Sequence, residues 1–197
     1  MLQTFINTQG SVFMAACSVA TRLTGLSNVT ITSLASAATT FSGQNLGAGN
    51  YDRLYRGGWQ IPVVSSGITL GLGLAMMACC APLLRLFTQE PEVLLLAERY
   101  LRVNLPFFWT YTMFNAILSY VNGMGQVRYT TVVNLLMLWA VRVPAAWVIT
   151  RWFDGTYVMV CYPISFTFGM LAMLLFYLSP RWREIRAKAG AERAAAS

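Results

Sequence analysis

The chain has 197 residues, of which 56% are hydrophobic and 11% are charged, and its formal net charge is +7. A soluble domain contains about a quarter charged residues, so this composition excludes an ordinary soluble protein. Long uncharged runs cover residues 1–21, 23–51, 57–84, 103–127 and 155–180. Most of them exceed the roughly 20 apolar residues that a helix needs to cross a bilayer. The sequence therefore predicts an all-α, polytopic membrane helical bundle whose first partner is the lipid bilayer.

In chain order, residues 1–20 mix polar and apolar side chains, and we expect the end of one helix, a short connection and the first turns of the next. A chain that opens within a helix also predicts a missing upstream segment. Spanning helices are expected near residues 24–46, 59–84, 103–124, 130–150 and 156–179. Residues 1–180 would thus form about five full transmembrane helices, followed by a basic tail over residues 181–197.

The first expected span ends in a glycine-rich stretch, GQNLGAGNYDR, over residues 43–53. A dinucleotide-binding loop needs G-x-G-x-x-G between a strand and a helix, and no third glycine follows Gly47 and Gly49 at that spacing. Gly43 and Gly47 instead form a G-x-x-x-G pair, which lets two membrane helices approach closely. Gly49 and Asn50 suit the left-handed turn that ends a helix. The stretch therefore predicts a packing surface followed by a helix end.

Basic residues are distributed unevenly between the two sides of the expected bundle. Four lie on one side, namely Arg85, Arg99, Arg102 and Arg151. Eight lie on the side of the tail, namely Arg53, Arg56, Arg128, Arg181, Arg183, Arg186, Lys188 and Arg193. Because cytoplasmic loops contain the excess of Lys and Arg, the C-terminal tail is predicted to be cytoplasmic. The same asymmetry explains most of the positive charge, so the charge does not indicate a nucleic-acid partner.

Few residues could support catalysis or metal binding. The sequence has no histidine, and its seven carboxylates all lie in the expected loops or in the tail. A membrane-embedded hydrolase or metalloenzyme needs acid, base or ligand groups at depth. The four cysteines show no metal-ligand spacing. We therefore expect no enzymatic activity, no metal site and no cofactor.

A polar stripe lies on the expected span near 103–124. Asn104, Tyr111, Asn115 and Asn122 are separated by 7, 4 and 7 residues, which places their side chains within roughly 40° of one another on a helix. Such a stripe is unfavourable against lipid, so it should face a cavity or another helix. One interpretation is the polar wall of a substrate pathway, with Phe108 beside it. The other is a set of hydrogen bonds between helices.

The expected span near 130–150 contains one charge, Arg142, in the motif LWAVRVPAAW. A charge at the centre of a bilayer is costly by at least a few kcal/mol. The guanidinium could bond the carbonyls that Pro144 leaves free, or a polar neighbour such as Asn134, and thereby have a structural role. Direct contact with an anionic group is the alternative.

Several motifs occur in an order that resembles a known family. INTQGSVFMAA, TRLTGL and GQNLGAGNYDR are followed by YLRVNLPFF, NGMGQ, LWAVRVPAA and YPISF. Together they resemble the second lobe of MATE (multidrug and toxic compound extrusion) transporters over about residues 5–182. The motifs are more similar to the DinF-like bacterial branch than to the NorM-like branch.

The resemblance implies a fold and a function. MATE transporters have twelve helices in two six-helix lobes around a central cavity, and they export cationic or amphipathic drugs across the bacterial inner membrane in exchange for Na⁺ or H⁺. This chain resembles the end of the seventh helix and the eighth to twelfth helices, which belong to the C-terminal lobe. It would then need the missing N-terminal lobe or a second subunit, and the isolated chain is expected to be inactive.

The resemblance also implies where the coupling ion binds. DinF-like members place the coupling aspartate in the first lobe, and NorM-like members use acids in the seventh and tenth helices. Residues 103–124, which match the tenth helix, contain no acid, so the coupling carboxylate is expected outside this chain. Two other interpretations remain open: a non-transporting membrane scaffold or interaction subunit, and a half-size transporter assembled from two copies.

Overall fold

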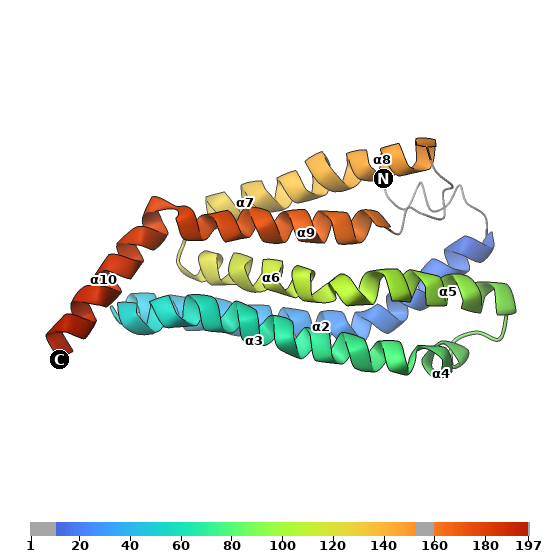
Figure 1. The fold of residues 1–197 in the computed structure, drawn as a ribbon, viewed down its shortest axis with the longest axis horizontal. Helices are drawn as coiled ribbons and strands as arrows, with labels where there is room; N and C mark the ends of the chain where they lie inside the picture. Colours follow the sequence, from blue (N-terminus) through green and yellow to red (C-terminus); the bar gives the residue numbers. More distant parts are fainter. Residues whose placement is uncertain (1–10, 153–159, 197) are drawn as a thin grey trace.

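The computed structural model describes residues 11–152 and 160–196, and every regular element in these ranges is helical. The long helices lie side by side along one axis, and α10 leans away at one end of the bundle (Figure 1). In chain order they are α2 (Ser11–Gly47), α3 (Tyr51–Ala78), α4 (Cys80–Arg85), α5 (Pro91–Asn104), η1 (Leu105–Phe107), α6 (Phe108–Gly123), α7 (Val127–Leu135), η2 (Leu136–Arg142), α8 (Val143–Trp152), α9 (Cys161–Leu174), η4 (Leu175–Leu178) and α10 (Pro180–Ala196). The predicted all-α fold is confirmed. The helix end that we expect at the start of the chain lies in residues 1–10, outside the described residues.

Two long rods contain a turn of different pitch next to a proline. In the rod α5–η1–α6, the 3₁₀ turn η1 contains Pro106. In the rod α7–η2–α8, the π-helical segment η2 ends just before Pro144. Because proline has no N–H and its ring crowds the preceding turn, the regular α-helical hydrogen bonds cannot continue through it. The expected spans near 103–124 and 130–150 are therefore parts of longer rods.

Tyrosines of other helices donate hydrogen bonds to backbone carbonyls of α3 in the turns before Pro62. Pro62 lies inside α3 and cannot donate a hydrogen bond to the carbonyl of Gly58, four residues earlier. The hydroxyl of Tyr177, in η4, donates to that carbonyl, and the hydroxyl of Tyr120, in α6, donates to the carbonyl of Leu54. Backbone groups inside a bilayer need such partners. The expected span near 59–84 differs from the observed helix at both ends. α3 begins earlier, at Tyr51, and ends earlier, at Ala78, and the separate helix α4 follows it.

Three helices of the described part are long and apolar enough to cross a membrane, judged by length and composition: Tyr51–Ala78, Val127–Ile149 and Cys161–Leu178. They overlap the expected spans near 59–84, 130–150 and 156–179, the last of which starts outside the described residues. α2 and α6 are richer in Ser, Thr and Asn and do not meet the same criterion. The membrane spans near 24–46 and 103–124 therefore stay predictions.

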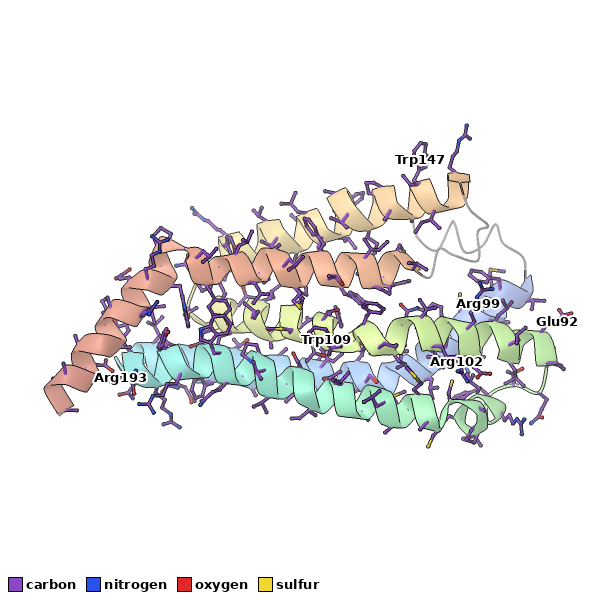
Figure 2. The ribbon with its side chains drawn as sticks, viewed as in Figure 1. Glu92, Arg99, Arg102, Trp109, Trp147 and Arg193 are labelled. Carbon is purple, nitrogen blue, oxygen red and sulfur yellow. The ribbon has the colours of Figure 1, made fainter. Side chains whose placement is uncertain are left out.

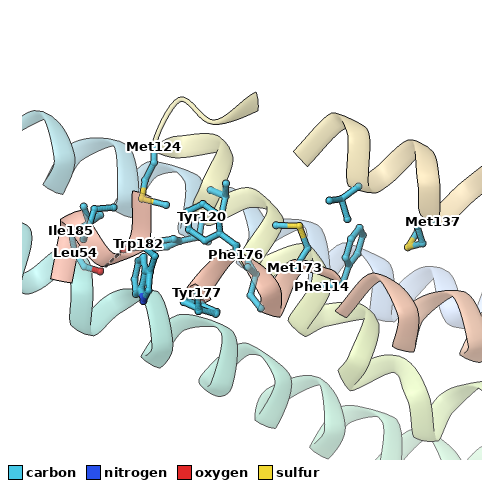
Figure 3. Close-up of a cluster of buried hydrophobic side chains, with 14 residues drawn as sticks. Leu54, Phe114, Tyr120, Met124, Met137, Met173, Phe176, Tyr177, Trp182 and Ile185 are labelled. Atoms are coloured by element: carbon cyan, nitrogen blue, oxygen red, sulfur yellow. Dashed lines mark hydrogen bonds between the residues drawn. The ribbon is translucent and has the colours of Figure 1, made fainter. Parts of the chain in front are cut away.

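The largest buried cluster lies at the end of the bundle next to α10 (Figure 3). Tyr120, Ile117 and Leu54 are completely buried there. Trp182 of α10 is 3% exposed and contacts Tyr177 edge-on, with ring centroids 4.8 Å apart. A second cluster, at the opposite end, joins α2, α4 and α5 through residues such as Leu23, Leu84 and Leu101. A third, smaller cluster joins α2, α8 and α9 through Phe13, Ala146 and Cys161.

The basic tail forms a helix that packs against α3. Trp182, Ile185 and Ala189 of α10 are buried. Near the end of α10, the two carboxylate oxygens of Glu192 accept hydrogen bonds from the backbone N–H groups of Tyr51 and Asp52, at 2.9 and 2.8 Å. A negative charge at a helix N-terminus is stabilising because the first N–H groups have no partner within the helix. Arg193, labelled in Figure 2, forms an ion pair with Asp52 of α3.

Candidate functional site

A polar and aromatic pocket of about 190 Å³ lies where α2, the rod α5–η1–α6, η2 and α9 meet. Its wall consists of Thr21, Thr24, Asn28, Tyr100, Asn104, Phe108, Tyr111, Arg142, Tyr162 and Phe166. Polar groups are unfavourable within an apolar bundle unless they have partners or face water or a ligand. The pocket is therefore the first candidate for a functional site.

One continuous rod supplies four of the lining residues. Tyr100, Asn104, Phe108 and Tyr111 are spaced by 4, 4 and 3 residues, and side chains at these spacings share one face of a helix. The 3₁₀ turn η1 lies within this series without removing any of the four from the pocket. Asn104 is 1% exposed, and its Nδ2 donates to the carbonyl of Tyr100 at 2.9 Å. The amide is thus held in place by the preceding turn.

Tyr162 and Phe166 of α9 form the opposite wall and contact the rings of the rod. The ring centroids of Tyr111 and Phe166 are 4.4 Å apart, and those of Phe108 and Phe166 are 6.3 Å apart in an edge-on contact. Tyr162, one turn before Phe166 on α9, contacts Tyr100 edge-on at 6.3 Å. Aromatic pairs at these separations contribute about 0.5–1.5 kcal/mol beyond the burial of their area. The rings therefore hold α9 against the α5–η1–α6 rod.

Arg142 is the single charged residue among those that line the pocket. Its Nε donates to the hydroxyl of Ser165 at 3.1 Å, and its guanidinium carbon lies 5.2 Å from the Tyr162 ring centroid and 5.5 Å from that of Phe166. Cations above aromatic faces at such distances are attracted by the ring quadrupole. Asn134 is exposed, and the described partners of Arg142 are residues of α9 instead of Asn134 or a carbonyl freed by Pro144.

Within residues 11–152 and 160–196, no carboxylate forms an ion pair with Arg142. The positive charge is thus placed by one hydroxyl and two rings, all from α9. These contacts fit the structural interpretation of Arg142, and its contact with an anionic group stays a prediction.

The polar stripe divides into two parts. Asn104 and Tyr111 line the pocket with Phe108, whereas Asn115 and Asn122 do not. Asn115 is half-buried, and its Nδ2 donates to the carbonyl of Tyr111 at 2.9 Å, within its own helix. Asn122 accepts a hydrogen bond from the hydroxyl of Thr130, at the start of α7. Asn122 therefore links α6 to α7, whereas the described hydrogen bond of Asn115 stays within α6.

Sequence reasoning missed the pocket residues on α2 and α9. Thr21, Thr24 and Asn28 recur at spacings of 3 and 4, and Tyr162 and Phe166 at a spacing of 4. Both patterns place their residues on one helix face and were visible in the sequence. They were missed because short hydroxyl-bearing and aromatic residues are frequent along both helices.

The predicted glycine packing surface involves one of its two glycines. A Cβ on Gly43 would lie 3.3 Å from the carbonyl oxygen of Gly123 in α6, whereas a Cβ on Gly47 would meet nothing within 4 Å. A Cβ on Gly123 would lie 2.3 Å from the carbonyl oxygen of Thr39. α2 and α6 thus approach each other at Gly43 and Gly123. Gly49 has a φ of +73° in the turn between α2 and α3, the left-handed region that favours glycine.

No group of three or more His, Cys, Asp or Glu side chains comes together as a metal site in the described ranges. Their acidic residues lie outside the pocket wall. The pocket therefore offers amide, hydroxyl, aromatic and guanidinium groups, which suit binding by hydrogen bonds and ring contacts.

A helical bundle with several rods apolar enough to cross a bilayer and a polar pocket between them defines a multi-pass membrane protein. The MatE family profile matches residues 1–148, and the chain belongs to the MatE family. The resemblance found in the motifs is thus confirmed.

Relatives with curated descriptions include two proteins of Bacillus subtilis (strain 168) and one of Thermotoga maritima. Probable multidrug resistance protein YoeA is 30% identical over 88% of this chain and 38% of its own length. Probable multidrug resistance protein YpnP is 25% identical over 94% of this chain and 42% of its own length. For Probable multidrug resistance protein NorM of T. maritima the identity is 23%, over 75% of this chain and 32% of that protein. The chain therefore spans about two fifths of the first two relatives, and no solved structure matches it.

Proposed function

We propose that the chain forms one lobe of a multidrug efflux transporter in the bacterial plasma membrane, and that its pocket forms part of the drug pathway. Membership of the MatE family and the printed names of the relatives support efflux of drugs. The match to about two fifths of each B. subtilis relative supports one lobe of a two-lobed transporter. The C-terminal helix α10 would face the cytoplasm, as the excess of basic residues on its side indicates.

The observation that carries the proposal is the pocket, whose polar and aromatic wall lies inside an apolar bundle. Its volume of about 190 Å³ is below the roughly 300–1,000 Å³ of sites that enclose a whole drug-sized ligand. The pocket would therefore enclose part of a drug. The rest of the drug would contact a complementary N-terminal lobe.

The chemistry of the wall favours particular parts of a substrate. Asn104 and Tyr111 offer an amide and an aromatic face, and Phe108 adds apolar surface. Arg142 repels a cation, so the positive group of a cationic drug would lie away from it, toward the complementary lobe. An amphipathic drug would place its uncharged polar or aromatic part here.

Export coupled to Na⁺ or H⁺ would use a carboxylate outside this chain. Described acidic residues such as Asp52, Glu98 and Glu192 lie apart from the pocket and have hydrogen-bonding or ionic partners of their own. A cation held at depth needs a carboxylate or several carbonyl oxygens. The isolated chain would therefore not drive ion-coupled export.

Expression of the chain in a pump-deficient bacterial strain tests the proposal. The chain is produced alone and together with the first lobe of the YoeA relative, the lobe that the motifs of this chain do not resemble. Dye efflux is measured with and without the Na⁺ and proton gradients, after normalising to the amount of membrane protein. We expect gradient-dependent efflux when the two lobes are produced together and no efflux when the chain is produced alone.

The other outcomes distinguish the alternatives. Gradient-dependent efflux from the chain alone would favour a half-size transporter assembled from two copies. No efflux from a stable, membrane-inserted pair would contradict the proposed function and favour a scaffold or interaction subunit.

A further inference from the structure

A second depression, separate from the polar pocket, is lined by residues of α3, α6, α9, η4 and α10. Figure 1 shows that η4 and the start of α10 lie at one end of the bundle. The depression has a volume of about 980 Å³, and its floor includes Met113 of α6. The aliphatic side chains along it are exposed: Leu171 by 55%, Leu175 by 61% and Leu178 by 66%. We call this depression the lateral groove.

Two arginines of α10 stand at the end of the lateral groove. Arg183 and Arg186 belong to its wall, and their spacing of three residues places them on one face of the helix. Both are exposed. The groove therefore combines a long apolar floor with a positive end, and these two features occur on different helices that pack together.

The other cations of α10 each have a carboxylate partner within the chain. Glu184 pairs with Arg181 at 3.1 Å and with Lys188 at 3.2 Å, and Asp52 pairs with Arg193. The hydrogen bonds from Lys188 and Arg181 lower the pKa of Glu184 from its ordinary value, so Glu184 stays ionised and engaged at neutral pH.

Arg183 and Arg186 form no ion pair with any of the described residues. They are therefore available to an anion from outside the chain.

The wall between the floor and the arginines is rigid and aromatic. Trp59 and Tyr177 stack with ring centroids 4.0 Å apart at 18°, and Tyr177 is anchored through its hydrogen bond to the carbonyl of Gly58. Trp182, which also lines the groove, is 3% exposed. Trp and Tyr are the residues that gather at the level of lipid headgroups. The order along the groove is thus apolar, then aromatic, then cationic.

We propose that the lateral groove binds an anionic phospholipid of the cytoplasmic leaflet, with an acyl chain on the apolar floor and the phosphate on Arg183 and Arg186. The order of side chains matches the order of groups in a phospholipid from tail to headgroup. Basic pockets between membrane helices on the cytoplasmic side bind anionic headgroups in this manner. A zwitterionic phospholipid such as phosphatidylcholine offers the same phosphate, but its cationic amine is repelled by the two arginines. An apolar protein helix would use the floor and offer no anion.

Lipid binding by the purified full chain in detergent tests the proposal. Native mass spectrometry compares dioleoyl phosphatidylglycerol with dioleoyl phosphatidylcholine, which have the same acyl chains. Each arginine near an anionic lipid contributes about five-fold to the affinity, so we expect a preference for phosphatidylglycerol of about 25-fold. The double variant Arg183→Gln/Arg186→Gln should lose this preference and keep its weak binding of phosphatidylcholine.

Two controls keep the result specific. Arg53→Gln/Arg128→Gln removes the same charge from two exposed arginines on the same predicted side of the membrane, and it should keep the preference. Leu171→Gln/Leu175→Gln should weaken the binding of both lipids, since the acyl chain would lose its apolar floor. Inorganic phosphate should not compete if the site takes a lipid and not a free anion.

Three results would overturn the proposal. The first is an undiminished preference in Arg183→Gln/Arg186→Gln, and the second is an equal loss in the Arg53→Gln/Arg128→Gln control. The third is displacement of phosphatidylglycerol by an added first lobe, which would assign the groove to contact between lobes. None of these results depends on transport, so they do not bear on the proposed efflux function.

Discussion

Substitution of Gly123 by alanine is expected to separate α2 from α6. The structure brings these helices together at this glycine, where an added Cβ would lie 2.1 Å from Oγ of Ser42 and 2.3 Å from the carbonyl oxygen of Thr39. Real Cβ atoms do not approach other heavy atoms so closely. Ser42 can rotate away, but the carbonyl of Thr39 belongs to the backbone of α2, so the helix itself must move.

The magnitude follows from the type of clash. Inserting a carbon into a well-packed contact costs about 1–3 kcal/mol, and the hydrogen bond from Thr39 Oγ1 to the carbonyl of Ser119, 3.0 Å long, would lengthen as well. For a chain of this size each kcal/mol corresponds to about 2–4 °C in the midpoint of thermal unfolding. We expect Gly123→Ala to lower that midpoint by roughly 2–12 °C.

The matched control is Gly47→Ala, in the same pair of helices. Its Cβ would meet nothing within 4 Å, and alanine is favoured over glycine in a helix by about 0.5–1 kcal/mol, so the midpoint should rise slightly. Thermal unfolding of both variants in detergent, followed by circular dichroism, decides the question. A Gly123→Ala variant at least as stable as Gly47→Ala would refute the close approach of α2 and α6.

Three further substitutions have defined outcomes. Glu192→Ala removes the acceptor for the first N–H groups of α3, and a loss of about 0.5–2 kcal/mol should appear as faster proteolytic release of α10; an unchanged rate would exclude the cap. Gly58→Ala places a Cβ 2.2 Å from the ring of Trp182, so the ring should leave its buried site and the tryptophan emission should shift to the red; an unshifted spectrum would contradict this packing. Gly49→Ala forces an L side chain into a φ of +73°, at a cost of about 1–2 kcal/mol in chemical unfolding, and wild-type stability would disprove the left-handed turn.

The class of fold and the family could be predicted from the sequence. Charge-free runs of sufficient length indicated helices in a membrane, and the motif order indicated the family that the comparisons establish. Local chemistry also located the turn at Gly49, because glycine is the residue that takes a positive φ without strain. Each of these patterns is formed by residues that are close together in the sequence.

Features that depend on distant contacts could not be predicted. The partner of Gly43 is Gly123, and Glu192 caps a helix that begins 141 residues earlier at Tyr51. Arg142 has its partner Ser165 on a different helix. In each case the residue type indicated a need, such as close approach, an anion or a hydrogen bond, without indicating which helix would meet it.

The polar stripe shows the limit of helical periodicity. The sequence placed Asn104, Tyr111, Asn115 and Asn122 on one face, and a single angle cannot tell which neighbour each part of a long rod meets. The structure places Asn104 and Tyr111 at the pocket, while Asn122 bonds Thr130 on α7. One face of the α5–η1–α6 rod therefore faces the pocket along one part of its length and α7 along another.

Drug transport by Tyr111→Leu and Asn115→Leu, in the chain paired with its complementary lobe, tests the central claim most directly. Tyr111 lines the pocket, whereas Asn115 bonds its own helix. Loss of an aromatic face against the uncharged aromatic part of an amphipathic dye is worth about 0.5–1.5 kcal/mol, so efflux normalised to membrane protein should fall roughly two- to thirteen-fold in Tyr111→Leu. Asn115→Leu should keep wild-type efflux. Equal efflux in the two variants, at equal protein levels, would contradict the assignment of the pocket to the drug pathway.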